Sequence, residues 1–148
     1  MDCLQHSIEA EPCESEAYLD KGLIHYRCED LGEAILSFEQ AIKYDKFSRY
    51  TDKAIFYIGA SKIKEKDYYG AIHSLNRATS ETSDQKILRK FAESVILLMK
   101  KKHEESINAF TQLLAEDNPI LKEYIESCYM YRAYGYTCLL YTSDAADE

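Results

Sequence analysis

The chain has 148 residues, enough for one domain or a short repeat array but too few for a two-domain enzyme. Two prolines and five glycines leave long uninterrupted segments rich in helix-forming residues, so the composition predicts an α-helical protein. The formal net charge of −8 argues against nucleic-acid binding, because that binding needs a basic face.

The N-terminal segment, residues 1–14, lacks the basic start and the apolar centre of a signal peptide. The longest apolar run, residues 95–99, is too short to span a bilayer. The five cysteines are odd in number and include no CxxC pair, which predicts reduced thiols and no zinc site. We therefore expect a soluble cytoplasmic protein that binds neither a metal nor a membrane.

Three segments share an apolar pattern that describes one helix face: a small residue, large apolar residues at +1 and +4, and a further core position at +7. Two of the three segments also carry a large apolar residue at +8. The residues are Ala34, Ile35, Phe38, Ala41 and Ile42 in the first segment, Ala71, Ile72, Leu75 and Ala78 in the second, and Ser106, Ile107, Phe110, Leu113 and Leu114 in the third.

Another small residue stands twelve positions before each of these segments: Gly22, Gly59 and Ser94. A fixed offset between two small residues is what two antiparallel helices need when their axes approach closely across a tight turn. The repeating unit is therefore predicted to be a helical hairpin with a period near 35 residues. A fourth small residue, Gly135, follows 41 residues after Ser94.

Helix-start signals separate the predicted helices. Asp30 with Glu33 has the spacing of a capping box, and Asp67 precedes the next second helix. Between hairpins, helix-start signals are found at Ser83 with Asp84 and at Asn118 before Pro119.

These segments resemble tetratricopeptide repeats. Residues 15–45 match through Tyr18, Gly22, Ala34, Phe38 and Ala41, and residues 52–79 match through Ile58, Gly59, Tyr68, Ala71, Leu75 and Ala78. In the third, weaker unit, Ser94 and Ser106 replace the glycine and alanine of the family. The predicted units are residues 15–48, 52–83 and 87–118, a partial first helix at 128–137 with Tyr131, Tyr134 and Gly135, and at 1–14 the end of a possible preceding repeat with Pro12 in the usual proline place.

The resemblance implies a right-handed α-solenoid whose first helices line a concave groove that receives a peptide or helix of a partner protein. The groove positions are mostly apolar, which suggests an apolar ligand: Leu19, Leu23, Tyr26, Phe56, Ile63, Phe91, Val95 and Leu98. Phe56 and Phe91 are the expected anchors. The alternative is that some of these residues pack between hairpins or lie beneath a further helix.

The last eleven residues, 138–148, resemble the translation of a transposon-end adapter used in preparing sequencing libraries. We expect this tail to be adapter-derived and exclude it from the fold. Asp144, Asp147 and Glu148 contribute −3 to the formal charge, which leaves −5 for the rest. The natural sequence is then expected to be a fragment that continues beyond Thr137.

The sequence offers no convergent set of catalytic residues and no phosphate-binding loop or nucleophile motif, so neither an enzyme nor a cofactor site is predicted. His25 with Cys28 could touch a metal, but two ligands do not make a site. The family's carboxylate clamp for chaperone C-terminal tails is absent, since its positions hold Leu19, Leu23, Tyr57, Leu88 and Ala92. We expect a protein-interaction scaffold; the alternative is the recruitment arm of a larger enzyme, and RNA binding is disfavoured by charge.

Overall fold

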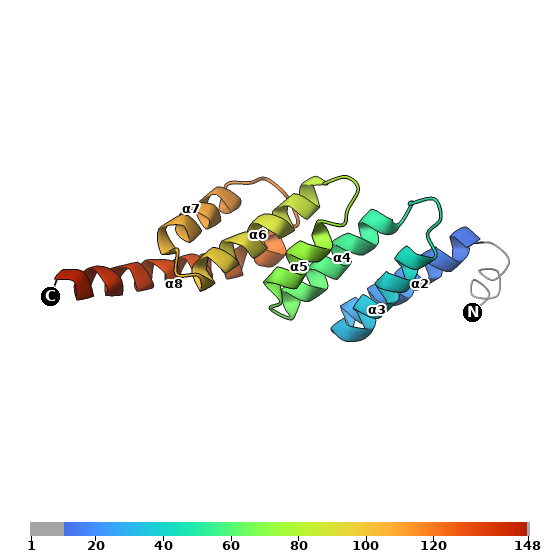
Figure 1. Cartoon of the computed structure of the whole chain (residues 1–148), viewed down its shortest axis with the longest axis horizontal. Coiled ribbons are helices and arrows are strands. Elements are labelled where there is room, and N and C mark those ends of the chain that lie inside the picture. Colours follow the sequence, from blue (N-terminus) through green and yellow to red (C-terminus); the bar gives the residue numbers. More distant parts are fainter. Residues whose placement is uncertain (1–10, 148) are drawn as a thin grey trace. The chain divides into compact units, whose positions relative to one another are not determined.

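The computed structural model describes residues 11–147, with side chains for residues 14–141. Within this range the chain forms seven α-helices and no strand (Figure 1). It divides into two compact units, Met1–Glu81 and Thr82–Glu148. The prediction of an all-α fold built from successive helical hairpins is confirmed.

The N-terminal unit consists of two hairpins. Its helices are α2 (Glu11–Arg27), α3 (Leu31–Lys43), α4 (Thr51–Lys64) and α5 (Tyr68–Leu75). In Figure 1, α2 lies beside α3 and α4 lies beside α5, and each pair is joined by a short turn. The two hairpins are in contact because α4 packs against α3 and also touches α2.

Glycine permits the close approach of the two helices in each of these hairpins. A Cβ atom on Gly22 would lie 2.6 Å from Cε1 of Phe38, and one on Gly59 would lie 2.8 Å from Cγ of Leu75. Both facing side chains, Phe38 and Leu75, are fully buried. The small residues therefore face the large apolar residue of the second helix, sixteen positions later, and the hairpin core forms around this contact.

Each hairpin turn contains one non-glycine residue in the left-handed backbone region, seven positions after the small residue of the first helix. The three residues are Glu29 (φ 61°), Lys66 (φ 65°) and Lys101 (φ 63°). In every case the next backbone N–H donates to a carbonyl five residues earlier, at 2.8 to 2.9 Å. This bond closes the end of the first helix in the manner of a Schellman motif. The three hairpins thus turn in the same way.

The C-terminal unit contains one hairpin and one long helix. The hairpin is α6 (Ser83–Met99) with α7 (His103–Leu114), and the long helix is α8 (Leu121–Asp147). Within the hairpin, the hydroxyl of Ser106 donates to the backbone carbonyl of Ser94 at 2.9 Å. Figure 1 shows α8 running alongside this hairpin, where it packs mainly on α7 and also touches α6.

Some of the helix caps in the structure agree with the prediction and others differ from it. Asp67 caps α5 as predicted, because its side chain accepts from the N–H of Gly70 at 3.0 Å. The predicted capping box of Asp30 is wrong, since Asp30 makes no side-chain cap bond. Helix α6 is capped by Thr82, one residue before the predicted Ser83, and Thr82 and Gln85 form a capping box in which each side chain accepts from the other's backbone N–H.

The limits of the repeats also differ from the prediction. Of the segment expected to close a preceding repeat, residues 1–10 lie outside the described residues, and residues 11–14 belong to the first turns of α2. Ala78 lies beyond the end of α5 and is only half-buried. Helix α8 does not end near Thr137 but continues through the adapter-like residues to Asp147.

Candidate functional site

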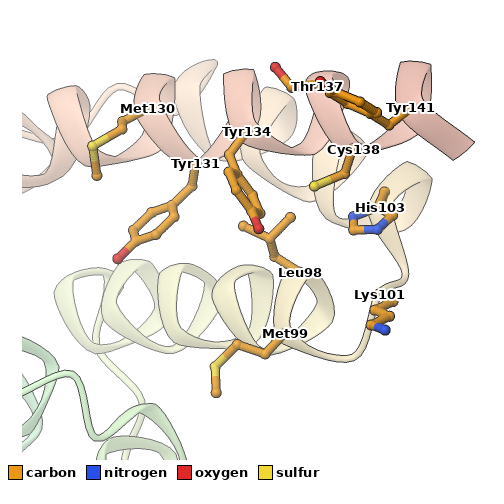
Figure 2. Close-up of a pocket in the computed structure, with 10 residues that line it drawn as sticks. All are labelled: Leu98, Met99, Lys101, His103, Met130, Tyr131, Tyr134, Thr137, Cys138 and Tyr141. Carbon is orange, nitrogen blue, oxygen red and sulfur yellow. The ribbon is translucent and has the colours of Figure 1, made fainter.

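The C-terminal unit contains a groove with a volume of about 840 Å³ between the end of α6 and the middle of α8. We call it the α6–α8 groove. Its lining comprises Leu98, Met99, Lys101, His103, Met130, Tyr131, Tyr134, Thr137, Cys138 and Tyr141. Figure 2 shows Tyr131 and Tyr134 extending from α8 toward α6, with Leu98 opposite Tyr134.

Helix periodicity explains how α8 supplies one wall of the groove. Met130, Tyr134, Thr137 and Tyr141 are spaced by four, three and four residues, so they lie on one face of the helix. Met130 is 60% exposed and Tyr134 is 59% exposed. This face therefore offers thioether and aromatic surface to a ligand.

The groove also has a polar end. Lys101 and His103 line it beside the turn between α6 and α7. The Nδ1 atom of His103 is buried without a hydrogen-bond partner among the described residues. A hydrogen bond with the Cys138 thiol raises the pKa of Tyr134 above its ordinary value.

The predicted groove residues of the C-terminal unit divide between the groove and the core. Leu98 lines the groove, although it is only 7% exposed. Phe91 is 2% exposed, and its ring contacts those of Phe110, Tyr124 and Tyr131 at centroid distances of 5.2 to 6.2 Å. Val95 is also buried. Phe91 and Val95 therefore have the packing role that the sequence left open as the alternative.

The predicted groove residues of the N-terminal unit divide in the same way. Leu19 and Ile63 are buried, whereas Leu23, Tyr26 and Phe56 are half-buried. Tyr26 meets the ring of Tyr57 edge-on at 5.5 Å, and the Lys64 ammonium lies 4.2 Å from the centroid of Tyr26. The first helices α2 and α4 thus expose a partly covered aromatic surface.

Several of the residues expected to pack within the repeats are buried or stacked in the structure, whereas Ala78 is only half-buried. Tyr18 stacks on Tyr44 with ring centroids 5.5 Å apart. The side chains of Ala34, Phe38, Ala41, Ala71, Leu75 and Phe110 are completely buried. Ser94 and Ser106 are also buried and share the hydrogen bond described above.

Among the residues that the structure describes, no third metal-ligating side chain joins His25 and Cys28. His25 Nδ1 lies 3.4 Å from Asp30 Oδ2, and Cys28 is exposed. Among the residues with described positions, no group of three or more His, Cys, Asp or Glu side chains could hold a metal ion. No helix in that part of the chain is both long and apolar enough to cross a membrane.

Sequence reasoning missed much of the α8 wall. It singled out Tyr131 and Tyr134 only as helix markers, and it excluded Cys138 and Tyr141 with the tail. The spacing of Met130, Tyr134, Thr137 and Tyr141 is the signal that could have identified this wall. What the spacing could not show is that Met99, at the end of another helix, lies across from it.

The family comparison matches the first hairpin, which has the geometry described above. Residues 15–47 match the tetratricopeptide repeat model. The matched segment contains most of α2, the whole of α3 and the turn between them. Tetratricopeptide repeats generally mediate protein–protein interactions and are non-catalytic scaffolds. No curated protein and no solved structure matches the chain.

Proposed function

We propose that the chain is a protein-interaction scaffold that binds an apolar peptide or helix of a partner protein in the α6–α8 groove. The observation that carries this proposal is the exposed wall of α8, where Met130 and Tyr134 face a groove of about 840 Å³. Both residues precede the adapter-like tail, which also contributes Cys138 and Tyr141 to the lining of the groove.

The chemistry of the wall favours a ligand with large apolar side chains. Methionine adapts its shape to different apolar groups, and tyrosine adds a rigid ring with a hydroxyl that can donate a hydrogen bond. The ammonium of Lys101 at the polar end is complementary to a carboxylate of the ligand. The preferred ligand is thus an amphipathic segment with an acidic residue at one end.

The first-helix surface of the N-terminal unit is proposed as a second, separate binding surface. Leu23, Tyr26 and Phe56 are only half-buried, which leaves aromatic surface available on α2 and α4. Phe56 thus remains a proposed anchor in this unit. A recruitment arm of a larger enzyme, the alternative function, would use these surfaces for the same kind of binding.

The experiment compares two double variants of α8 as baits for partner proteins. Met130→Ala with Tyr134→Ala removes the groove wall, whereas Tyr129→Ala with Tyr136→Ala removes equally exposed apolar surface outside the groove. Partners captured from a lysate of the source cell are quantified by mass spectrometry. Truncating an anchoring aromatic residue commonly costs about 2 kcal/mol or more of binding free energy. The amount of each specific partner captured by the groove variant should therefore fall about tenfold or more.

The matched variant should retain those partners. Circular dichroism should show wild-type helicity for both proteins, because all four side chains are exposed. If the groove variant captures the same proteins in the same amounts as the wild type, the α6–α8 groove is not the binding site.

A further inference from the structure

The second helix of the second hairpin, α5, ends earlier than its counterparts. All three second helices begin at the same position of the repeat, but α3 has 13 residues and α7 has 12, whereas α5 has 8. The apolar pattern of the repeat continues beyond Leu75, because Ala78 occupies the core position of Ala41 and Leu113. Ala41 and Leu113 are completely buried, whereas Ala78 is only half-buried. The sequence of residues 76–80 therefore fits a helical turn that the structure does not form.

The backbone beyond Leu75 tightens instead of continuing the helix. The N–H groups of Arg77 and Ala78 donate to the carbonyls three residues earlier, at 3.1 and 3.2 Å, rather than four residues earlier as in an α-helix. The next N–H, that of Thr79, would donate to the carbonyl of Leu75 in a continued α-helix. In the structure it donates instead to Oδ1 of Asp52 at 3.2 Å. Asp52 thus takes the donor that the next helical hydrogen bond needs.

Two hydroxyl groups add to this contact with Asp52, which lies in the first turn of α4. The hydroxyl of Thr79 donates to the carboxylate with its oxygen 3.1 Å from Oδ2, and the hydroxyl of Ser80 donates to Oδ2 at 3.2 Å. The N-terminal end of a helix favours a negative charge, so the carboxylate is suited to its place. We call Asp52, Thr79 and Ser80 the Asp52 latch. The latch holds the backbone of residues 79 and 80 against the start of α4.

An ion pair with the preceding hairpin fixes the start of the segment. The guanidinium of Arg77 donates to both carboxylate oxygens of Glu39, at 2.7 and 3.2 Å. A contact through two parallel hydrogen bonds is geometrically specific. Because Arg77 is held in this way, a change in the latch is confined to residues 78–80.

Opposing contributions act on residues 78–80. A continued helix would bury Ala78 as Ala41 is buried, and it would satisfy the Thr79 N–H with a backbone carbonyl. The latched arrangement keeps the contacts with Asp52, and Thr79 and Ser80 have a lower helix propensity than alanine. Because hydrogen bonds contribute only modestly to net stability, these contributions are of similar size.

We propose that residues 78–80 form a conformational switch, which exchanges between the latched state of the structure and a rewound state in which α5 continues to Ser80. Opening the latch returns the Thr79 N–H to the helix. In the rewound state only residues 81 and 82 remain between α5 and α6, so the switch sets the length of the connection between these helices. None of its residues belongs to either proposed binding surface, so the inference does not rest on the proposed function.

The experiment compares residues 76–80 of the full chain with the same residues of the variant Asp52→Ala by NMR. Removing the carboxylate opens the latch, so the Cα chemical shifts of residues 78–80 should move downfield to helical values. Amide hydrogen exchange at Thr79 and Ser80 should slow about tenfold or more, because both N–H groups then bond to the backbone. In the wild type, relaxation dispersion should detect a rewound state populated at about 0.1 to 10%. Its chemical shifts should be those of the variant.

Two further variants separate the latch from general effects on helix stability. Thr79→Val removes one hydroxyl and keeps the shape and helix propensity of threonine. It should raise the rewound population about two- to tenfold, as the loss of one hydrogen bond does, and it tests the switch even where Asp52→Ala unfolds. Glu33→Ala removes an acidic residue from the first turn of α3 and should leave residues 76–80 unchanged.

Two results would overturn the proposal. One is that residues 78–80 keep non-helical chemical shifts in Asp52→Ala, which would show that the local sequence alone ends α5 at Leu75. The other is the absence of a rewound state in both the wild type and Thr79→Val. Neither measurement involves a partner protein, so its outcome is independent of the binding experiments.

Discussion

Two glycines of this protein differ in what surrounds them, and the difference predicts opposite effects of the same substitution. Gly59→Ala places a Cβ atom 2.8 Å from the side chain of Leu75, which is completely buried. Overpacking of this kind costs about 1 to 3 kcal/mol. Gly59→Ala should therefore lower the free energy of unfolding in urea, and Gly59→Leu should lower it further.

Gly32 is the matched control. It also lies in a helix, with no atom within 4 Å of an added Cβ and without a positive φ angle. Gly32→Ala should raise the free energy of unfolding by about 0.5 to 1 kcal/mol, because alanine loses less conformational freedom on folding. Equal effects at the two positions would show that the close approach of α4 and α5 is not under steric control.

Single residues also show where sequence reasoning reaches its limit. The apolar periodicity of α6 placed Phe91 and Leu98 on one face, and both were assigned to a groove. Phe91 is covered by Tyr124 and Tyr131, which lie more than thirty positions later in the sequence. Periodicity within one helix does not contain that information, because burial depends on which distant helix packs against it.

Among the elements, the start of α4 depends on a side chain that lies before the helix. Asp45 accepts hydrogen bonds from the N–H groups of Arg49, Tyr50 and Thr51 and from the Thr51 hydroxyl, at 2.7 to 3.1 Å. Burial alone would raise the pKa of Asp45, but these bonds outweigh it and lower the pKa below its ordinary value of 3.8. The ionised carboxylate is thus the form that stabilises the helix start.

Asp45→Ala should lower the free energy of unfolding at pH 7 by about 1 kcal/mol, as the loss of a helix cap does. Because the folded-state pKa is lowered, the contribution of Asp45 is present above pH 3.8 and is lost as the pH falls through the folded-state pKa. The difference between variant and wild type should shrink in acid. Urea titrations at neutral and acidic pH test this, and a pH-independent difference would contradict it.

Helix starts were predictable where the cap lies next to its helix. Asp67 was found by its position before the second helix, and it caps α5. Asp45 was not found, because its carboxylate reaches across a loop to Tyr50 and Thr51. The backbone path of that loop is not readable from residue types.

For the whole molecule, the adapter-like tail should be dispensable for folding. Leu140 is 66% exposed and Tyr141 is 76% exposed, so the tail adds length to α8 but little to the core. Deleting residues 138–148 should leave the thermal unfolding midpoint nearly unchanged and the transition cooperative. Differential scanning calorimetry of the shortened and full chains measures both quantities. A marked fall in the midpoint or a broad transition would show that the tail belongs to the fold.

The repeat order of the chain was predictable because small residues recur at fixed offsets. Gly22 and Gly59 indicated two hairpins, and Ser94 indicated the third although it is not a glycine. The fourth helix was expected, but the contact made by its small residue was not: a Cβ atom on Gly135 would lie 3.1 Å from Cγ1 of Ile107 in the preceding hairpin. The sequence does not show which distant helix a small residue faces.

The left-handed residues in the hairpin turns bear on the order of events during folding. The left-handed backbone conformation costs a non-glycine residue about 1 to 2 kcal/mol of conformational free energy, which glycine would largely avoid. Glu29, Lys66 and Lys101 each adopt this conformation. A turn of this kind does not form stably by itself, so docking of the two helices must offset its strain. Each hairpin should therefore close its turn late, after its apolar faces meet, and the turn residues should have little structure in the folding transition state.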